Sequence, residues 1–543
     1  MTPRRIFAPL VVALVVLVIL FAVVTYLPLR SARDEWRAGK LADAISDAES
    51  WSKTRMWPNQ YREVLAASFM TAGREDAARP YLDAMRGHPL MFSVIPKGEL
   101  ANKLFARGAY QPFLDYDSAV RARSEPADVA LYRAAALVAT NRVDQANSAL
   151  QSIDRTKVDP KKVAALQTAI AQRRSGRWPY VIDRNGKTIA TYGPALVAPD
   201  FEGLVTGSGK FTIAANAQRL GTNETIETTL DADIQHAAKV ALQNYRGAFV
   251  VIDPRTNELL AVVSNGSPAN LALEQQYEPG SIMKVLTGLN ALSNGVDIKS
   301  MFPYDCKGEL MIDGRHFGDW LPYGHGVLPD LDEALAESCN VAFADIGLRV
   351  GSDRLRKFMT SAGFDGQTDL GLFKVPLGQF KGDVFNKFET AFVAIGLEHE
   401  TVTALHVAML ASMMANRGVL TTPRLLRARR SVLGEVVVGP PPQAQARLAP
   451  QEVAQQMVQA MVAVVARPKG TGRRAEVEGL PIALKTGTAG EQKNGYQAVI
   501  MAFAPADSPQ IAFGIIAENA GPAEFAAAHV ARNFLLAIRG RLK

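Results

Sequence analysis

The first feature of the hydrophobic pattern is an uninterrupted apolar run near the start of the chain. Between Ile6 and Leu29 no residue carries a charge, and Val, Leu, Ile and Ala dominate. With a rise of about 1.5 Å per residue, a helix of this length crosses a hydrocarbon layer of about 30 Å. A secretory signal peptide usually has a shorter apolar core, of about 7–15 residues. The pattern therefore predicts a transmembrane signal anchor over residues 1–30.

Alanine-rich helical segments follow and recur with a period of 34 residues. Gly39-Lys40 returns as Gly73-Arg74, and residues 74–82 resemble residues 142–150 two periods later. This period is the length of a tetratricopeptide helix–turn–helix unit, although the Trp and Tyr landmarks of that unit are not in place. We therefore expect a tetratricopeptide-like helical region over 31–172, with an irregular helical domain as the alternative. A stacked helical array usually presents a concave surface to peptides or partner proteins.

Short apolar strands and helices alternate in the rest of the chain. The sequence pattern over residues 173–225 predicts a linker or short pedestal, with a hairpin turn at Asn185-Gly186. The later pattern gives strands at 248–252 and 259–263, a largely helical section over about 280–465, strands at 482–488, 498–504 and 511–517, and a closing helix at 525–538. This order predicts an α+β domain over 226–543, in which helices cover an antiparallel sheet.

Composition and charge exclude several classes of protein. Apolar residues make up 48% of the chain and charged residues 21%, which excludes a mostly disordered protein. The net charge of +7 is small for 543 residues, so we expect no nucleic acid partner. The two cysteines exclude a disulfide scaffold and a zinc site built from paired cysteines. We expect no metal and no cofactor, and we interpret His325 and His399 as structural.

The state of Cys306 and Cys339 stays open on sequence alone. An oxidising compartment outside a membrane permits a disulfide between them. Two buried free thiols are the alternative, because the sequence does not fix the separation of the two residues. No histidine pairs with Cys339 in a recognisable pattern, so we do not expect it to be a nucleophile.

The first of three motifs with candidate chemistry is Glu278-Pro-Gly-Ser281-Ile-Met-Lys284. Pro279 and Gly280 turn the chain into an apolar helix, so that Ser281 lies in a first turn where free backbone N–H groups favour negative charge. Lys284 follows on the same helix face. A serine needs a proton acceptor within hydrogen-bond reach to act as a nucleophile. A lysine can serve if burial and nearby cations keep it partly neutral.

The other two motifs are Ser338-Cys339-Asn340 and Lys485-Thr486-Gly487-Thr488. In the second motif, a hydroxyl and a carboxamide one residue apart can face one cavity at the end of a helix. In the third motif, Gly487 allows a ligand to approach the backbone closely. The amine of Lys485 and the threonine hydroxyls attract a carboxylate, and a strand edge can pair with an extended peptide.

These motifs, in this order, make the chain resemble the penicillin-binding protein transpeptidase family. The resemblance covers about residues 226–520 and includes residues 247–254, Gly324-His-Gly326 and Lys469-Gly-Thr-Gly472. It implies a serine β-lactamase/transpeptidase-type fold. It also implies a D,D-transpeptidase that cross-links peptidoglycan stem peptides ending in D-Ala-D-Ala and is inhibited by β-lactams.

The resemblance also implies a role for each motif residue. The implied catalytic residues are Ser281, Lys284, Ser338, Asn340 and Lys485, and the implied substrate-binding residues are Thr486, Gly487 and Thr488. Ser281 is the acylated nucleophile and Lys284 the base that activates it. The remaining residues relay protons, hold the substrate amide and bind its terminal carboxylate. The backbone N–H groups of Ser281 and Thr488 form the oxyanion hole.

Some segments depart from the family pattern. Leu484 stands where a glycine is commoner, and Gly396-Leu-Glu-His399 replaces the usual Gly-Gln-Gly, which affects substrate choice and rate. No segment resembles a glycosyltransferase module. Residues 183–186 echo the entry motif of the monofunctional class B branch, so we expect a class B-like protein with an atypical amino-terminal module.

Several alternatives share these residues. A D,D-carboxypeptidase uses the same groups with water as the acceptor, and a β-lactamase needs a deacylating base that we do not identify. A peptide-sensing scaffold that recruits partners through the helical repeats is an alternative of another class.

The topology prediction depends on function. Arg4 and Arg5 precede the apolar run and four basic residues follow it closely, so charge counting favours export of the amino terminus. The implied substrate lies outside the cytoplasmic membrane, however, and long domains translocate largely regardless of loop charge. We therefore expect a single-pass inner-membrane protein with its catalytic domain on the periplasmic side. The helical region is expected to bind other cell-wall synthesis proteins.

Overall fold

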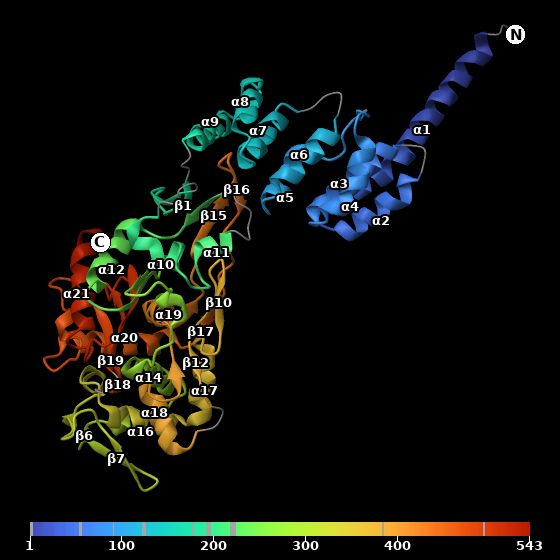
Figure 1. Ribbon diagram of the computed structural model, residues 1–543. Coiled ribbons are helices and arrows are strands. Elements are labelled where there is room, and N and C mark those ends of the chain that lie inside the picture. The colour runs from blue at the N-terminus through green and yellow to red at the C-terminus, as the bar shows by residue number, and fades with distance from the viewer. Residues whose placement is uncertain are drawn as a thin grey trace.

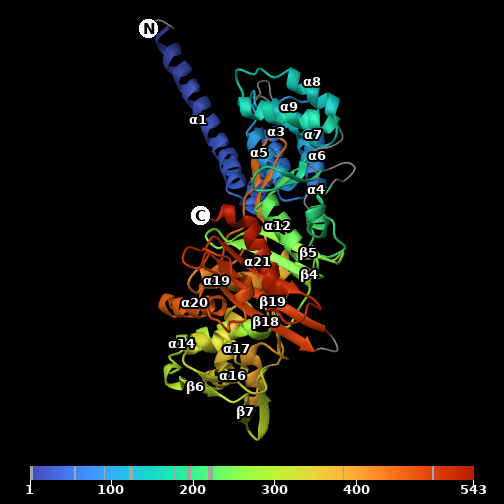
Figure 2. The same cartoon turned by 90° about the vertical axis from the view of Figure 1, so that its left-hand side faces the viewer.

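The computed structural model describes residues 4–53, 57–90, 92–121, 126–175, 179–191, 197–217, 224–382, 385–491 and 495–542. Two separate hydrophobic cores divide the protein. One core is built almost entirely from residues 29–170, and the other extends from Tyr180 to Ile538. Figures 1 and 2 show the corresponding parts at opposite ends of the molecule, with the amino-terminal portion of the first helix projecting away from both.

The amino-terminal part is entirely helical where it is described. Its helices are α1 Arg4–Arg37, α2 Leu41–Ser52, α3 Pro58–Thr71, α4 Glu75–Met85, α5 Lys97–Phe105, α6 Tyr110–Ala119, α7 Val129–Ala139, α8 Val143–Gln151 and α9 Pro160–Arg174. We call α1–α9 the helical region. Its core buries aromatic side chains such as Trp36, Phe105 and Phe113 completely. Within the described residues, none of the helices combines the length and the apolar character needed to span a membrane.

Left-handed turn residues recur along the helical region. Gly39, Gly73, Gly108 and Asn141 have φ angles of 77°, 76°, 74° and 61°, and they precede α2, α4, α6 and α8. Glycine adopts this conformation without steric cost, and asparagine tolerates it better than most residues. The turns, spaced 33–35 residues apart, account for the period seen in the sequence.

A five-stranded sheet joins the two parts. Its strands are β1 Pro179–Ile182, β2 Thr188–Thr191, β3 Thr225–Thr228, β15 Leu426–Arg430 and β16 Val436–Val438, in the order β16-β15-β3-β1-β2. The predicted hairpin at Asn185-Gly186 is confirmed, because β1 and β2 pair in antiparallel fashion around it. At the tip of the β15–β16 hairpin, Leu433 is 3% exposed and belongs to the core of the helical region. This contact ties the helical region to the sheet.

The larger core surrounds a second antiparallel sheet. Its strands are β4 Gly247–Asp253, β5 Glu258–Asn265, β18 Ala483–Glu491, β19 Gly495–Ala504 and β20 Ile511–Ala517, in the order β18-β19-β20-β4-β5. All five strands were predicted, and the pairings confirm the antiparallel sheet. Residues on both faces of β4 and β20 are buried, which explains why the sequences of these strands are nearly continuous apolar runs.

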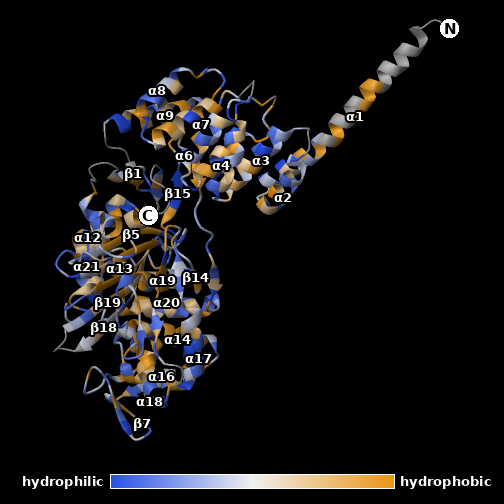
Figure 3. Cartoon of the chain, turned by 45° about the vertical axis from the view of Figure 1, so that its right-hand side comes forward, coloured by the Kyte–Doolittle hydropathy of each residue, from blue (hydrophilic) through white to orange (hydrophobic). Residues whose placement is uncertain are grey.

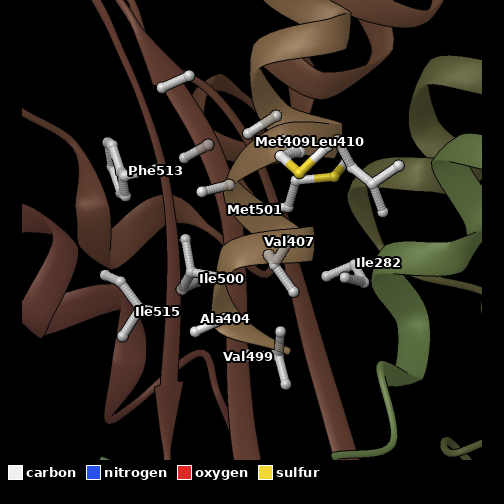
Figure 4. Packing of buried hydrophobic residues seen from close by; sticks show 14 of the residues in the cluster. Ile282, Ala404, Val407, Met409, Leu410, Val499, Ile500, Met501, Phe513 and Ile515 are labelled. Carbon is white, nitrogen blue, oxygen red and sulfur yellow. The ribbon is translucent and has the colours of Figure 1, made fainter. Parts of the chain in front are cut away.

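Helices cover both faces of this sheet. Helices α12 Ala232–Leu242 and α21 Ala527–Ile538 pack on one face, and α19 Ala404–Ala415 packs on the other. Every residue of α19 is buried, as expected for a helix that is apolar all round. A Cβ at Gly514 of β20 would lie only 2.7 Å from the Ala404 oxygen, so glycine lets α19 approach the sheet. Figure 4 shows Val407 of α19 and Ile282 beside this face, and Figure 3 shows apolar residues along the central strands.

The section predicted as largely helical contains more strand than expected. Its helices are α14 Met283–Ser293, α15 Leu331–Ala336, α16 Asn340–Val350, α17 Ser352–Ser361, α18 Lys387–Ile395, α19 and α20 Gln451–Ala466. Its additional short strands are β6 Tyr304–Cys306, β7 Glu309–Ile312, β8 Arg315–Gly318, β9 Gly326–Leu328, β10 Gln367–Asp369, β11 Lys374–Pro376, β12 Gln379–Phe380, β13 Glu400–Thr401, β14 Val419–Thr421 and β17 Gln445–Arg447. Strands of two to four residues are too short for the period-two pattern to identify. Three further short helices lie outside this section, namely α10 Glu202–Val205, α11 Ile213–Ala217 and α13 Leu271–Glu274.

Candidate active site

Ser281 lies where a short 3-10 turn, Gly280–Ile282, leads into α14. This turn packs directly on β18. Gly280 has a φ angle of 57°, and a Cβ there would lie 2.7 Å from the Thr488 oxygen and 3.0 Å from the Thr488 nitrogen. A side chain at this position would therefore separate the two segments. Gly280 also donates its N–H to the carbonyl of Gly396 at 2.9 Å, which fixes the turn from the other side.

Lys284 is completely buried one helical turn after Ser281. Its Nζ donates to the Ser338 carbonyl at 2.5 Å, to Ser338 Oγ at 3.1 Å and to Asn340 Oδ1 at 2.6 Å. Burial lowers the pKa of Lys284 to about 8, although the nearby Asp319 carboxylate opposes that shift. At neutral pH a useful fraction of the amine is thus unprotonated and able to accept a proton.

Lys485 lies on β18, also fully buried, on the other side of Ser338. Its Nζ donates to Ser338 Oγ at 2.8 Å and to the Thr486 carbonyl at 2.9 Å. Burial and the positive charge of Lys284 hold the pKa of Lys485 well below its usual range. Ser338 Oγ therefore bridges two lysines and forms a path for a proton between them. Ser338 has a φ angle of 59°, a conformation that is rare for a residue other than glycine and that recurs at functional sites.

A cavity of about 370 Å³ opens over these groups. Five of the eight residues predicted from sequence line it, namely Ser281, Ser338, Asn340, Thr486 and Thr488. Lys284 and Lys485 are fully buried behind the residues that line the cavity. The structure thus brings three motifs, more than 50 and 140 residues apart in sequence, to one place.

Gly487 has a different environment from the one we expected. A Cβ at this position would lie 2.4 Å from the Pro279 oxygen, so the segment that approaches its backbone is the turn before Ser281. Thr486 and Thr488 are also fixed by neighbouring segments. Thr486 Oγ1 donates to Thr471 Oγ1 at 2.7 Å, and Thr488 Oγ1 accepts the N–H of Ala523 at 3.1 Å.

The sequence reasoning did not assign several residues of the cavity wall. These are Trp320, Leu397, Thr471, Ala489, Gly490, Tyr496, Pro522 and Glu524. Thr471 belongs to Lys469-Gly-Thr-Gly472, a segment of the family resemblance that implies no role for this threonine. Leu397 belongs to the segment that departs from the family pattern. The other residues lie in loops and strand ends that carry no local signal.

Behind the second motif, the structure gathers the two cysteines. Cys306 and Cys339 are both buried and are free thiols, with their sulfur atoms 3.2 Å apart. Asp319 accepts the backbone N–H groups of Asn340 and Val341 at 2.8 and 3.2 Å. This carboxylate therefore anchors the start of α16, and with it the Asn340 side chain that contacts Lys284.

Comparison with known proteins agrees with this geometry. Residues 247–538 match the family described as the penicillin binding protein transpeptidase domain. The chain is 30% identical over 341 residues to the peptidoglycan D,D-transpeptidase MrdA of Acinetobacter baumannii, an alignment that covers 54% of this chain and 50% of that protein. It is also 30% identical over 328 residues to the stage V sporulation protein D of Bacillus subtilis, covering 54% and 49%. The chain thus spans about half the length of these curated relatives.

Solved structures share the fold. The penicillin-binding protein PBPA of Mycobacterium tuberculosis superposes with a TM-score of 0.59 at 21% identity, covering 67% of this chain and 99% of that one. The PBP2 of Pseudomonas aeruginosa superposes with a TM-score of 0.59 at 24% identity, covering 67% and 97%. The α+β fold with helices on both faces of an antiparallel sheet is therefore the transpeptidase fold.

Proposed function

Because the chain belongs to the penicillin-binding protein transpeptidase domain family, we propose that it is a D,D-transpeptidase that cross-links peptidoglycan stem peptides through an acyl-enzyme on Ser281. The relatives called peptidoglycan D,D-transpeptidase support the reaction class. The carrying observation is the position of Lys284. Its amine is buried, has a pKa lowered to about 8, and lies one helical turn from a serine on the cavity wall.

Acylation begins with attack by Ser281 Oγ on the carbonyl carbon of the penultimate D-Ala. The hydroxyl proton passes to the unprotonated Lys284 amine, and general-base help of this kind is typically worth about 10²–10⁴-fold in rate. The oxyanion forms beside the backbone N–H groups of Ser281 and Thr488, whose segments are in close contact through Gly280. The terminal D-Ala leaves as an amine after it receives a proton through Ser338 Oγ, which bonds both lysines. A β-lactam acylates Ser281 by the same attack.

Deacylation requires an acceptor amine from a second stem peptide. It attacks the ester of Ser281, gives up a proton to Lys284, and releases the serine hydroxyl as the new amide bond forms. β18 is the edge strand of its sheet, so it can pair with the extended donor peptide. Thr486 and Thr488 face the cavity, and their hydroxyl groups suit a terminal carboxylate.

Fluorescent penicillin labelling of the purified protein tests the nucleophile. Ser281→Ala removes the only hydroxyl proposed to carry the acyl group, so we expect no covalent label. Ser293→Ala, a serine at the far end of the same helix, is the matched control and should label like the wild type. Product analysis with a D-Ala-D-Ala peptide, with and without an acceptor amine, separates a transferase from a D,D-carboxypeptidase. Label retained in Ser281→Ala would contradict the acyl-enzyme.

We propose that the helical region is a tetratricopeptide-like module that binds other cell-wall synthesis proteins. The regular turns at Gly39, Gly73, Gly108 and Asn141 support a repeat architecture. Deleting residues 31–172 should leave penicillin acylation largely intact and abolish co-purification with such proteins. Leu433→Ser belongs in the same variant, because the deletion exposes this leucine. Loss of acylation in a still-folded deletion protein would instead make the helical region a structural pedestal.

We also propose that Ile6–Leu29 anchors the chain in the cytoplasmic membrane, with residues from Ser31 onward on the outer side. The support is the uncharged apolar run in the sequence, and the fact that the proposed substrate lies outside the membrane. A reporter fused after Lys543 should therefore behave as exported. A cytoplasmic reporter signal would contradict both the topology and the cell-wall assignment.

A further inference from the structure

Glu524 lies on the wall of the active-site cavity and has no part in the proposed acylation. Among the described residues that line this cavity, it is the only one with an acidic or basic side chain. The proposed donor peptide brings a terminal carboxylate into the same space, and a second negative charge nearby repels it. The Glu524 carboxylate therefore weakens donor binding unless it serves a positively charged group.

The fold holds Glu524 close to the nucleophile. Ala523 donates its backbone N–H to Thr488 Oγ1 at 3.1 Å, which fixes the residue before Glu524 on strand β18. The Ser281 turn packs on the same threonine, because a Cβ on Gly280 would lie 3.0 Å from the Thr488 nitrogen. Ser281 and Glu524 thus approach Thr488 from two segments and line one cavity of about 370 Å³.

The carboxylate of Glu524 is not used by the structure around it. It has no hydrogen bond and no ion pair with any described residue, although acidic residues beside a helix start often accept N–H groups of the first turn. Burial raises the pKa of Glu524, and the positive charge of Arg474 opposes that rise. The Arg474 guanidinium, however, lies over the Phe525 ring, 4.7 Å from its centroid. A half-buried carboxylate is therefore left free for a ligand.

A second hollow continues the cavity on this side. Thr471 and Glu524 line both spaces, so they mark the junction between them. The hollow is also lined by Lys469, Arg473 and Arg474, which are exposed residues. These cations attract the terminal carboxylate of a second stem peptide. The hollow therefore offers a second peptide an approach that ends at Glu524.

We propose that Glu524 binds the amine of the second stem peptide that attacks the acyl-enzyme. This role rests on the proposed acyl-enzyme at Ser281. Amide formation from that ester is the reverse of the attack that made it, so the entering amine occupies the place from which the D-Ala amine left. Both amines are largely ammonium ions in neutral solution, and a carboxylate–ammonium contact is a strong, charge-assisted hydrogen bond. Glu524 thus serves the leaving and the entering group in turn.

The bound ammonium ion becomes a nucleophile after it releases one proton to water. Its nitrogen then forms the new amide bond and passes a second proton to Lys284, and Ser281 Oγ takes up that proton as the ester bond breaks. Glu524 holds the nitrogen and does not accept these protons. Because water competes for the same ester, an amine held in place raises the share of transfer over hydrolysis. Glu524 therefore favours the D,D-transpeptidase reaction over that of a D,D-carboxypeptidase.

The test compares a charged and an uncharged nucleophile on the full-length protein. Isotopically labelled D-alanine is an ammonium ion at neutral pH, and its incorporation into a peptide ending in D-Ala-D-Ala reports its attack on the acyl-enzyme. Hydroxylamine is uncharged at neutral pH and forms a hydroxamate from the same intermediate. Glu524→Gln should raise the D-alanine concentration for half-maximal exchange by about 3–20-fold, between the values for exposed and buried charge pairs. The yield of hydroxamate should not change.

Further variants separate this role from a general loss of activity. Glu476→Gln is the matched control, because this exposed glutamate lines the hollow but not the cavity, and it should exchange D-alanine like the wild type. Glu524→Lys should abolish exchange and still form hydroxamate. Exchange by Glu524→Gln equal to that of the wild type, or an equal loss with both nucleophiles, overturns the proposal. A wild-type protein that releases no D-alanine and takes no penicillin label refutes the acyl-enzyme at Ser281 and, with it, the role of Glu524.

Discussion

The helical region and the part that matches the transpeptidase family, residues 247–538, which we call the catalytic domain, use opposite ways of building a core. In the helical region, each helix packs mainly against its neighbours in sequence, such as α2 against α3 and α7 against α8. In the catalytic domain, β20 pairs with β4 across more than 250 residues of chain. A core of local contacts tolerates local change, whereas a site gathered from distant segments depends on the whole domain. The candidate active site lies in the second part, where its three motifs come from distant segments.

The two regions also treat a buried carboxyl group differently. Glu63 in the helical region is fully buried but is bonded by Ser93, by Tyr116 and by the backbone N–H groups of Val94 and Ile95. Glu400 in the catalytic domain is equally buried, and neither of its oxygens has a hydrogen-bond partner among the described residues. The backbone N–H groups of His399 and Glu400 favour its charged form, but burial and the nearby charge of Glu278 outweigh them. Hydrogen bonds thus offset more of the cost of burial at Glu63 than at Glu400.

The largest effect is expected at Lys284, which Ser338 and Asn340 from a distant segment hold in position. Lys284→Ala should lower the rate of penicillin acylation by about 10²–10⁴-fold, because it removes the proton acceptor of Ser281. Lys485→Ala should lower it less, since that amine touches Ser338 and Thr486 and not the attacking atom. Stopped-flow acylation of the purified variants measures both rates. Exposed Lys299→Ala is the control, and an effect of Lys485→Ala larger than that of Lys284→Ala would reverse the assigned roles.

A pair of phenylalanines tests whether the two cores are independent. Phe113 in the helical region and Phe249 in β4 are both fully buried, and truncation of either to alanine should cost about 3–5 kcal/mol in its own core. Phe249→Ala should lose acylation when its domain unfolds on heating. Phe113→Ala should keep acylation while its helices melt early. Parallel measurement of helicity and labelling against temperature separates the two events, and simultaneous loss in Phe113→Ala would show one cooperative unit.

The two buried glutamates should respond oppositely to substitution. Glu63→Met leaves the hydroxyl and N–H donors around this position without an acceptor, and it should destabilise the core by about 1–3 kcal/mol at pH 4, where Glu63 is largely uncharged. Glu400→Met replaces an unbonded carboxyl group by an apolar side chain of similar size. It should therefore stabilise the catalytic domain by about 1–3 kcal/mol at neutral pH. Chemical denaturation followed by fluorescence measures both changes, and destabilisation by Glu400→Met would mean that a bonded group occupies its surroundings.

The same two residues predict how stability depends on pH. Burial raises the pKa of Glu63 to about 7, against its hydrogen bonds, and burial with the nearby charge of Glu278 raises the pKa of Glu400 well above its usual range. Each folded-state pKa lies above the unfolded value of about 4.3. The contribution to stability is therefore complete below that value and is lost as pH rises through the folded pKa. For Glu63 the loss should occur between about pH 4 and 7, and Glu63→Gln should remove it.

The smallest effect is expected at an exposed ion pair of the helical region. Arg37 and Glu99 form a two-point contact at 2.6 and 2.8 Å, but both side chains are more than 40% exposed. A double-mutant cycle on Arg37→Ala and Glu99→Ala should give a coupling energy of about 0.2–1 kcal/mol. The value should fall further in high salt. A larger, salt-independent coupling would show that this contact holds α1 to α5 more tightly than a surface pair does.

Much of the framework follows from sequence. Strands β4 and β20 of the main sheet are nearly continuous apolar runs, and the turns at Asn185-Gly186 and 253–257 have residues suited to hairpins. The three motifs also contain residue types whose chemistry is recognisable without a structure. Local pattern was sufficient in these cases because burial on both faces and turn geometry are local properties.

What the sequence did not reveal depends on contacts between distant segments. Cys306 and Cys339 are 33 residues apart, and only the pairing of β6 with β9 and the glycines of the connecting loop bring them together. The sequence also did not reveal that Gly487 makes room for the turn before Ser281, because that turn lies about 200 residues earlier in the chain. Trp320 and Glu524 reach the cavity from loops whose course no periodicity predicts.

The insertion of Leu433 into the core of the helical region has a consequence for the order of events during synthesis. The ribosome completes α9 about 260 residues before it reaches Leu433. At a typical rate of about 5–20 residues per second, the gap that Leu433 fills stays open for roughly 13–50 s. During that interval the newly made helices expose an apolar surface to whatever meets the nascent chain. The helical region is thus synthesised first but is among the last to complete its core, because that core needs Leu433 from the hairpin of β15 and β16.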